Sequence, residues 1–208
     1  RVASNFARWG FPASVLDAPG LESAVVSEGQ PPRSRLRVGY LSADFRTHAV
    51  GLIMPQVIEL HDRSHVEVFG YSMGVDDHSE TRKRLSAAFD HFVDLRDCSV
   101  AEMARRMRSD AIDILIDLHG WTTDGRPEAL AFRCAPLQVN WLGYAGTLGH
   151  PKLADYLLGD PVVTPLAHQH CYTETLAHLP NCYLPADCTV TLGARPSRRE
   201  AGLPEEGF

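Results

Sequence analysis

The chain has 208 residues, of which 44% are hydrophobic and 22% charged, and its formal net charge is −6. This length and composition are typical of a globular domain that buries its own core. The negative net charge and the scattered basic residues argue against a surface that neutralises nucleic-acid phosphates. No apolar run reaches the roughly 18 residues that a membrane span requires. We therefore expect neither nucleic acid nor a membrane among the partners.

The cysteines and the first residues indicate where the protein works. The five cysteines form no C-x-x-C pair, and their number is odd, so a disulfide framework is not indicated. Isolated thiols are typical of a reducing compartment. Residues 1–5 lack the charged head and apolar core of a signal peptide. The sequence therefore predicts a cytoplasmic protein.

Both ends of the chain differ in character from its middle. Residues 1–35 carry apolar and aromatic patches followed by a stretch rich in Gly, Ser, Glu and Pro. We interpret them as a helical segment and linker that belong to a preceding domain. Residues 36–201 form the predicted main domain. Residues 202–208 (GLPEEGF) resemble a turn that leads into a new strand, so we expect a second folded unit to begin there.

From Leu36 onward, apolar runs alternate with stretches of helical period. The run at 112–118 is almost continuously apolar, as expected of a strand that is buried on both faces. This alternation favours an open, parallel, Rossmann-like α/β sheet. The predicted strands are 36–41, 66–71, 91–95, 112–118 and 137–142, with weaker ones near 156–158 and 175–179. The predicted helices run through 52–60, 79–89 and 128–132 and through a stretch that Ser99 and Glu102 open with a capping box.

Polar residues and glycines gather in the loops that follow three of these strands. The loops are 42–51 (SADFRTHAVG), 117–126 (DLHGWTTDGR) and 140–149 (NWLGYAGTLG). In open parallel sheets, ligands bind beyond the carboxyl ends of the strands. Histidines, carboxylates and hydroxyls can recognise a polar ligand, and glycines let the backbone approach it closely. The sequence therefore predicts a binding site formed by these loops.

The same residues also have structural interpretations. Asp44 can cap the helix that follows, and His48 can close the first turn of that helix. Asp117 and His119 end a buried strand, where an unpaired carboxylate is costly, and this position favours a functional role. The glycines of the third loop lack the spacing of a dinucleotide-binding fingerprint, so a tight turn is the better interpretation.

Seven sequence phrases occur in the order and spacing of one enzyme family. They are RVGYLS with DFRTH (37–48), DILIDLHGWT (113–122), RCAPLQV (133–139), WLGYAGT (141–147), ADY (154–156), LPNCYLP (179–185) and GLP (202–204). From Leu36 to its end, the chain resembles the catalytic region of the O-GlcNAc transferase and SPINDLY family. It departs from the family pattern at Ala145, where several relatives have Pro, and at 149–152 (GHPK). Both departures concern the shape of the third loop.

The resemblance implies a GT-B glycosyltransferase, in which two Rossmann-like lobes face a cleft. This chain would supply the first lobe, joined to an upstream tetratricopeptide domain, and the second lobe would hold most contacts to the sugar nucleotide. The implied reaction is inverting transfer of N-acetylglucosamine from UDP-GlcNAc to Ser or Thr hydroxyls of a protein acceptor. The resemblance implies no metal, and no cofactor beyond the donor substrate. The alternatives are transfer of fucose from GDP-fucose, glucosylation of Asn, and a noncatalytic α/β module that binds protein or sugar.

The resemblance also assigns residues to the site. His48 matches the family histidine that reaches into the active site, and we expect it to be the catalytic residue. The other candidates lie in the same three loops and are expected to bind substrate. They are Asp44, Asp117, His119, Gly120, Thr122, Leu142, Gly143, Gly146 and Thr147.

Overall fold

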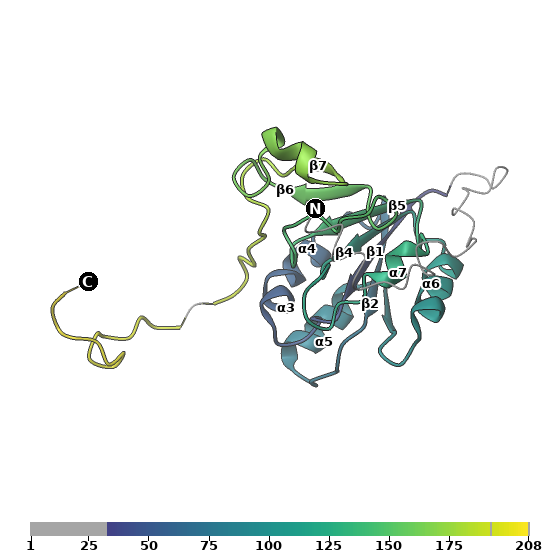
Figure 1. Cartoon of the computed structure of the whole chain (residues 1–208). Coiled ribbons are helices and arrows are strands. Elements are labelled where there is room, and N and C mark those ends of the chain that lie inside the picture. Colours follow the sequence, from purple (N-terminus) through teal and green to yellow (C-terminus); the bar gives the residue numbers. More distant parts are fainter. Residues whose placement is uncertain (1–32, 192, 208) are drawn as a thin grey trace.

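A computed structural model describes the fold over residues 33–191 and 193–207, so most of the expected helical segment and linker at 1–35 lies outside the described residues. Seven parallel strands form one sheet in the order β3-β2-β1-β4-β5-β6-β7 (Figure 1). This confirms the predicted parallel α/β architecture. The strands are β1 (Leu36–Ser42), β2 (Val66–Ser72), β3 (His91–Asp94), β4 (Ile114–Asp117), β5 (Leu137–Trp141), β6 (Tyr156–Gly159) and β7 (Thr175–His178).

Short helices connect the strands. They are α3 (Ala49–Ile53), α4 (Pro55–Glu59), α5 (Glu80–Ala88), α6 (Val100–Ser109), α7 (Glu128–Ala131) and the 3₁₀ helix η1 (Leu166–Cys171). The expectation of one continuous helix through 52–60 is wrong, because α3 ends at Ile53 and α4 begins at Pro55. Proline has no N–H to donate to the preceding turn, and its ring disfavours a helical interior. The 3₁₀ helix η1 was not predicted.

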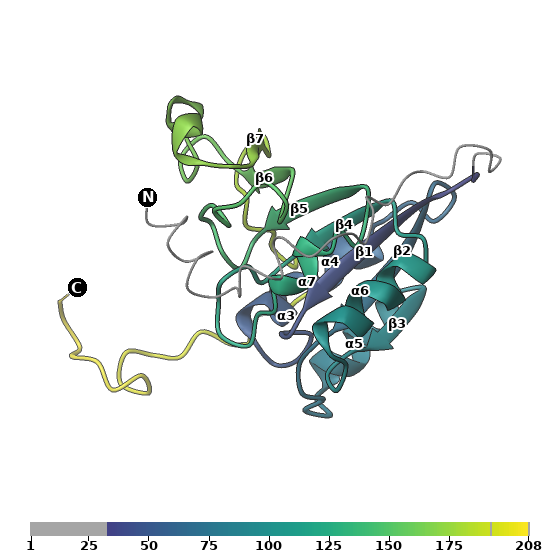
Figure 2. The same ribbon diagram turned by 45° about the vertical axis from the view of Figure 1, so that its right-hand side comes forward.

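Helices cover both faces of the sheet and create two apolar cores (Figure 2). Neighbouring residues of β1 belong to different cores: Tyr40 packs with the residues of α4 and α5, and Leu41 packs with those of α6 and α7. Successive side chains of a strand point to opposite faces, so one strand supplies both cores. Met103 and Met107 of α6 are completely buried on one side, as is Leu85 of α5 on the other.

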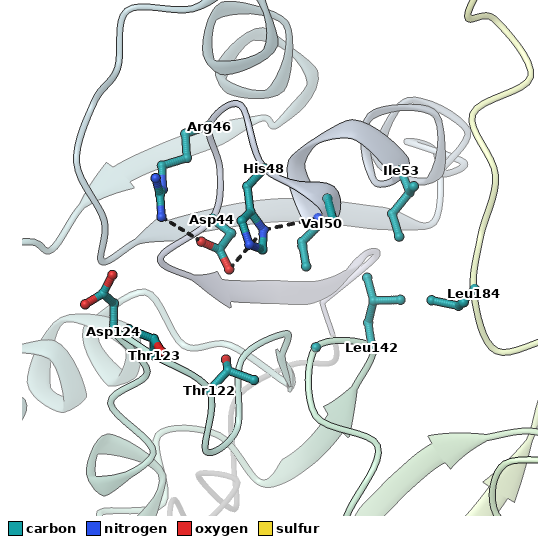
Figure 3. Close-up of a pocket in the computed structure, with 12 residues that line it drawn as sticks. Asp44, Arg46, His48, Val50, Ile53, Thr122, Thr123, Asp124, Leu142 and Leu184 are labelled. Carbon is teal, nitrogen blue, oxygen red and sulfur yellow. Dashed lines mark hydrogen bonds and ion pairs between the residues drawn. The ribbon is translucent and has the colours of Figure 1, made fainter. Parts of the chain in front are cut away.

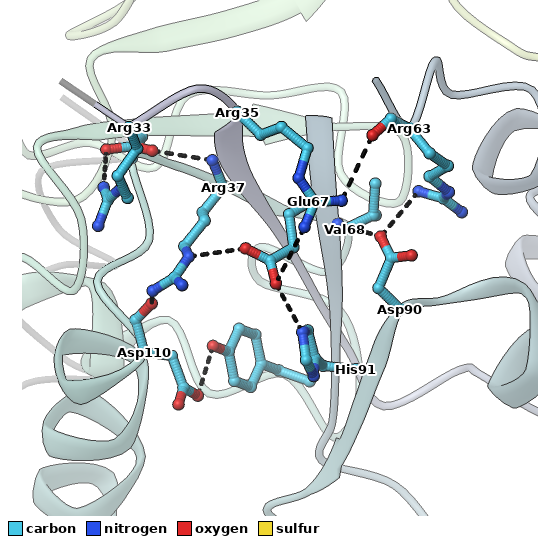
Figure 4. A network of polar contacts seen from close by, with 11 residues as sticks. Arg33, Arg35, Arg37, Arg63, Glu67, Val68, Asp90, His91 and Asp110 are labelled. Carbon is cyan, nitrogen blue, oxygen red and sulfur yellow. Dashed lines mark hydrogen bonds and ion pairs between the residues drawn. The ribbon is translucent and has the colours of Figure 1, made fainter. Parts of the chain in front are cut away.

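A polar network joins the amino ends of the central strands (Figure 4). The Glu67 carboxylate of β2 accepts Nε of Arg37 at 2.9 Å and lies 2.8 Å from Nε2 of His91. The hydrogen bond from His91, followed by those from Arg37, lowers the pKa of Glu67. Asp113, just before β4, accepts the backbone N–H of Arg37 at 2.8 Å. The charged groups at this edge therefore satisfy one another.

The order of the strands reverses between β1 and β4. The chain first adds β2 and β3 on one side of β1 and then crosses to place β4 and β5 on the other side. The loops after β1 and β4 therefore leave the sheet in different directions and open a crevice at its carboxyl edge. Such a switch point is the usual ligand position in an open α/β sheet.

The capping box of α6 provides a test of the fold. Oγ of Ser99 accepts the N–H of Glu102 at 3.3 Å, and the Glu102 carboxylate accepts the N–H of Ser99 at 2.7 Å. We expect Ser99→Ala to lower the free energy of unfolding by about 1 kcal/mol, because the N–H of Glu102 loses its acceptor. Urea denaturation measures this difference. Ser109→Ala, at the other end of α6, is the matched control and should stay within about 0.5 kcal/mol of the parent. Equal losses in the two variants would contradict the assignment of the cap.

Candidate functional site

A pocket of about 390 Å³ lies at the carboxyl edge of the sheet, between the loops that follow β1, β4 and β5 (Figure 3). Its volume falls in the range of small-molecule sites. The pocket therefore occupies the switch-point crevice of the fold. The residues that line it are Asp44, Arg46, His48, Ala49, Val50, Ile53, Thr122, Thr123, Asp124, Leu142, Gly143 and Leu184.

The two sides of the pocket differ in chemistry. Val50 and Ile53 from α3 face Leu142 and Leu184, and together they form an apolar side (Figure 3). The opposite side carries the guanidinium, carboxylate and hydroxyl groups of the β1 and β4 loops. A pocket with one apolar and one polar side can hold a ligand that has a hydrophobic face and a rim of hydroxyls or amides.

The loop after β1 is tightly folded against α3. The N–H of Asp44 donates to Oγ of Ser42 at 2.9 Å, and the N–H of Arg46 donates to the Asp44 carbonyl at 2.7 Å. A Cβ atom on Gly51 would lie 2.0 Å from the Arg46 carbonyl oxygen, so only glycine permits this approach. His48 is the N-cap of α3, and its Nδ1 lies 3.3 Å from the N–H of Val50. The structure thus confirms that His48 caps the first turn of α3 when its Nδ1 carries no hydrogen.

Asp44 does not serve as the N-cap of α3. Its carboxylate lies between three side chains: Oδ1 is 3.3 Å from the Arg46 guanidinium, and Oδ2 is 3.3 Å from Nδ1 of His48 and 3.4 Å from Nδ1 of His119. The Asp44 side chain is 9% exposed, and that of His48 is 43% exposed. A nearly buried carboxylate therefore links a partly exposed histidine to a buried one.

Asp117 shapes the turn that follows β4. Its carboxylate accepts the backbone N–H groups of His119 at 3.1 Å and Gly120 at 2.9 Å. Burial raises the pKa of this carboxyl group, and the two N–H donors and the His119 charge act against the rise. Gly120 adopts a left-handed φ of 56°, and a Cβ atom there would lie 2.6 Å from Cβ of Tyr144. Asp117 thus sets the direction of the loop from behind the pocket.

The loop after β5 contributes an apolar wall and a close backbone contact. Leu142 lines the pocket with a φ of 78°, a conformation that costs a non-glycine residue about 1–2 kcal/mol. A Cβ atom on Gly143 would lie 2.2 Å from the Leu118 carbonyl oxygen. Further along, Gly146 accepts the side-chain amide of Asn140 at 3.0 Å. The approach of Gly143 to Leu118 joins the second and third loops, and the Asn140 hydrogen bond lies within the third.

The predicted site residues occupy three kinds of position. Asp44, His48, Thr122, Leu142 and Gly143 line the pocket. The second group is buried beneath the loops and comprises Asp117, His119 and Gly120. Gly146 and Thr147 lie outside the lining, and the Thr147 hydroxyl donates to the Glu174 carboxylate at 2.7 Å. The roles assigned to all these residues remain predictions.

Several lining residues were not among the predicted ones. Arg46, Thr123 and Asp124 stand in the loops already singled out, so their polar character was an available signal. Leu184 stands in the family phrase at 179–185, but nothing in its spacing placed it near the three loops, because it reaches the pocket from a segment that returns after β7. There the Tyr183 carbonyl accepts Nε1 of Trp141 at 3.0 Å.

Two other features of the described residues bear on ligands. Across 33–191 and 193–207, no three or more His, Cys, Asp or Glu side chains are grouped so as to hold a metal ion. Within the same ranges, no helix has the length and apolar character needed to cross a membrane.

Comparison with known proteins decides the family. Residues 22–193 match the model of glycosyl transferase family 41. The chain belongs to this family. A probable UDP-N-acetylglucosamine–peptide N-acetylglucosaminyltransferase of Arabidopsis thaliana, SEC, is 39% identical over 180 residues, which cover 84% of this chain and 18% of that protein. The corresponding enzyme of Caenorhabditis elegans is 41% identical over 155 residues, or 74% of this chain and 13% of that protein.

The fold comparison agrees with the family. A solved mutant O-GlcNAc transferase of Thermobaculum terrenum superposes with a TM-score of 0.76 at 37% sequence identity. The match covers 88% of this chain and 34% of that one. The chain thus corresponds to a Rossmann-like part of a GT-B glycosyltransferase, and it spans less than a fifth of the two curated relatives named above.

Gly143 provides a test of the site's construction. We expect Gly143→Ala to destabilise the protein by about 1–3 kcal/mol, because the added methyl group overlaps the Leu118 carbonyl and forces two loops apart. Denaturant unfolding measures the loss of stability. Gly193→Ala is the control, since a Cβ atom at Gly193 meets nothing within 4 Å. Equal stability of the two variants would show that the loops are not in the close contact described.

Proposed function

We propose that this chain is one catalytic lobe of a protein O-GlcNAc transferase. The whole enzyme would transfer N-acetylglucosamine from UDP-GlcNAc to Ser or Thr hydroxyls of protein acceptors, with inversion at the anomeric carbon and without a metal. The relatives in Arabidopsis thaliana and Caenorhabditis elegans carry names that describe this donor and a peptide acceptor. Membership of the same family supports extending that activity to this chain.

One observation carries the proposal. His48 stands at the wall of a pocket at the switch point of the sheet, with 43% of its side chain exposed. An imidazole in that position can reach a substrate in the pocket. Histidine is the side chain whose ordinary pKa lies closest to neutral pH, so it can accept a proton under working conditions.

The chemistry assigned to His48 is general-base catalysis. The acceptor hydroxyl oxygen attacks the anomeric carbon, and the bond from that carbon to the UDP oxygen breaks. The hydroxyl proton passes to the imidazole of His48, and the departing diphosphate takes the negative charge. Proton transfer by a positioned base contributes about a hundred- to ten-thousandfold in rate.

The remaining parts of the pocket suit a sugar. Thr122, Thr123 and Asp124 offer hydroxyl, carbonyl and carboxylate groups that can hydrogen-bond sugar hydroxyls. The apolar side can contact the hydrophobic face of a sugar ring or the methyl group of an acetamido substituent. The Arg46 guanidinium, a cation in the lining, is already paired with Asp44. We therefore assign stabilisation of the diphosphate to a second lobe outside this chain.

The proposal extends to the rest of the protein. The second catalytic lobe and an upstream tetratricopeptide domain are the partners expected within the same polypeptide, with a UDP-sugar and a protein acceptor as external partners. A cytoplasmic location fits the isolated cysteines, all five of which are free thiols in the structure.

His48 is the first residue to test. In the intact enzyme, we expect His48→Asn to lower kcat about a hundred- to ten-thousandfold, because asparagine cannot accept the proton. Asparagine is a strong N-cap residue, so it should preserve α3, whereas His48→Ala would also cost up to about 1 kcal/mol of stability. Release of UDP from UDP-GlcNAc in the presence of acceptor peptide measures the rate.

Two comparisons complete this experiment. His65→Ala removes an exposed histidine away from the pocket and should retain the parent rate. Circular dichroism shows whether each variant is folded. A folded His48→Asn enzyme with near-parental turnover would remove His48 from the catalytic role. Parallel assays with GDP-fucose identify the donor, and release of GDP in place of UDP would overturn the choice of sugar.

The division of the active site between lobes gives a second test. We expect the isolated 208-residue chain to show no measurable turnover of UDP-GlcNAc, because the diphosphate contacts are assigned to the other lobe. A coupled assay for released UDP, run beside the intact enzyme, measures this. Turnover by the isolated chain at a rate comparable to that of the intact enzyme would overturn the two-lobe arrangement.

A further inference from the structure

A line of three side chains runs from the protein interior to the pocket. His119 is 1% exposed, Asp44 is 9% exposed, and His48 reaches the pocket surface. The same oxygen of Asp44, Oδ2, lies 3.4 Å from Nδ1 of His119 and 3.3 Å from Nδ1 of His48. His119 does not line the pocket, so a direct contact between it and substrate is not what the geometry favours.

The orientation of His119 is fixed from one side. Its Nε2 lies 2.7 Å from the Thr123 carbonyl oxygen. A carbonyl only accepts, so Nε2 must carry the hydrogen. Nδ1 is buried without a hydrogen-bond partner and faces the Asp44 carboxylate. The ring thus directs its second nitrogen at Oδ2 of Asp44. When Nδ1 takes up a proton as well, His119 becomes an imidazolium, and its Nδ1–H donates to the Asp44 carboxylate.

The ring of His48 has a choice of two arrangements. If the hydrogen is on Nε2, Nδ1 accepts the N–H of Val50 at 3.3 Å, and the ring offers the pocket no lone pair. If the hydrogen is on Nδ1, it points at the Asp44 carboxylate, also at 3.3 Å, and Nε2 is left with its lone pair. In this tautomer Nδ1 no longer accepts the Val50 N–H, so the cap on α3 is given up. Only the second tautomer can accept a proton from a hydroxyl at Nε2.

We propose that Asp44 is a positioning residue that holds His48 in the tautomer with hydrogen on Nδ1, and that His119, as an imidazolium, fixes the Asp44 carboxylate from behind. This inference rests on the proposed function, in which Nε2 of His48 takes the hydroxyl proton. The imidazolium of His48 that forms keeps its hydrogen on Nδ1, directed at the Asp44 carboxylate. No proton moves to the carboxylate, which stabilises the new charge.

The other charged groups near the pocket do not compete for Oδ2 of Asp44. Arg46 contacts Oδ1 of Asp44, the oxygen that the histidines do not use. Asp117 binds backbone N–H groups of its own loop, and Asp124 lines the pocket on the β4 side. From the segment before α5, Asp77 accepts the backbone N–H of Thr47 at 2.9 Å. Oδ2 of Asp44 is therefore the carboxylate oxygen placed beside both rings.

The central experiment replaces Asp44 by asparagine in the intact enzyme. Asparagine keeps the shape but removes the charge, and its amide can donate to Nδ1 and select the wrong tautomer. We expect kcat to fall about a hundred- to ten-thousandfold with the KM for UDP-GlcNAc little changed. Asp77→Asn is the matched control. It makes the same chemical change at a carboxylate that contacts Thr47, the residue before His48, and it should leave kcat unchanged.

A spectroscopic readout separates this role from a structural one. The ¹⁵N chemical shifts of the histidine ring nitrogens distinguish the two neutral tautomers. The spectra are recorded near pH 8.5, about two units above the ordinary histidine pKa, because an ordinary histidine ring is neutral there. We expect hydrogen on Nδ1 of His48 in the parent and in Asp77→Asn, and on Nε2 in Asp44→Asn. A His48→Gln sample assigns the signal, and thermal unfolding confirms that each variant is folded.

Two substitutions of His119 test the supporting role. Asn places an amide donor near the position of Nδ1, whereas Gln reaches the Thr123 carbonyl and leaves the Nδ1 position empty. If the contact to Asp44 matters, His119→Asn should be about ten- to a hundredfold faster than His119→Gln, the range expected for one hydrogen bond to a charged group. The reverse order would show that the contact to Thr123 is the important one.

The outcomes distinguish this inference from the proposed function. An inactive parent enzyme would refute the proposed function, while the tautomer of His48 remains measurable without substrate. An unchanged tautomer in Asp44→Asn would overturn the positioning role whatever the rate does. A changed tautomer with an unchanged kcat would show that the tautomer does not limit catalysis, and it would overturn the inference as well.

Discussion

The parallel pairing of β1 with both β2 and β4 is the constraint on which the rest of the structure depends. Parallel pairing brings the carboxyl ends of these strands to one edge, and the reversal of strand order beside β1 parts the loops that follow. The pocket exists because the chain must leave the sheet in opposite directions at this point. His48, Thr122 and Leu142 then meet although they are far apart in the sequence.

The two edges of the sheet handle their polar groups differently. At the amino edge, the Glu67 and Asp113 carboxylates are hydrogen-bonded to arginine, histidine and backbone N–H groups of the fold itself. At the carboxyl edge, Asp44 is also nearly buried, but its partners include a histidine that faces the pocket. A buried carboxylate must be paired, and here the pairing connects the interior with the pocket.

Close backbone contacts give the site its rigidity. Gly51 brings α3 against the β1 loop, and Gly143 brings the β5 loop against Leu118. The unusual backbone of Leu142 is held in the same region. Strained positions persist where the surroundings fix them, and they are common at functional sites. Contacts of this kind restrict the conformations that these loops can adopt.

The sequence by itself determined the strands, the parallel α/β class, the three polar loops and the family. These properties are local: buried strands such as Ile114–Asp117 are apolar, and turns carry Gly and Asp. Only the tertiary structure decided that His119 lies beside Asp44 rather than in the pocket lining, that Thr147 pairs with Glu174, and that Leu184 closes the apolar side. Such relations join residues that are distant in the chain, and periodicity and spacing carry no information about them. The distance between two side chains depends on strand order and loop path, and these are fixed only when the sheet is assembled.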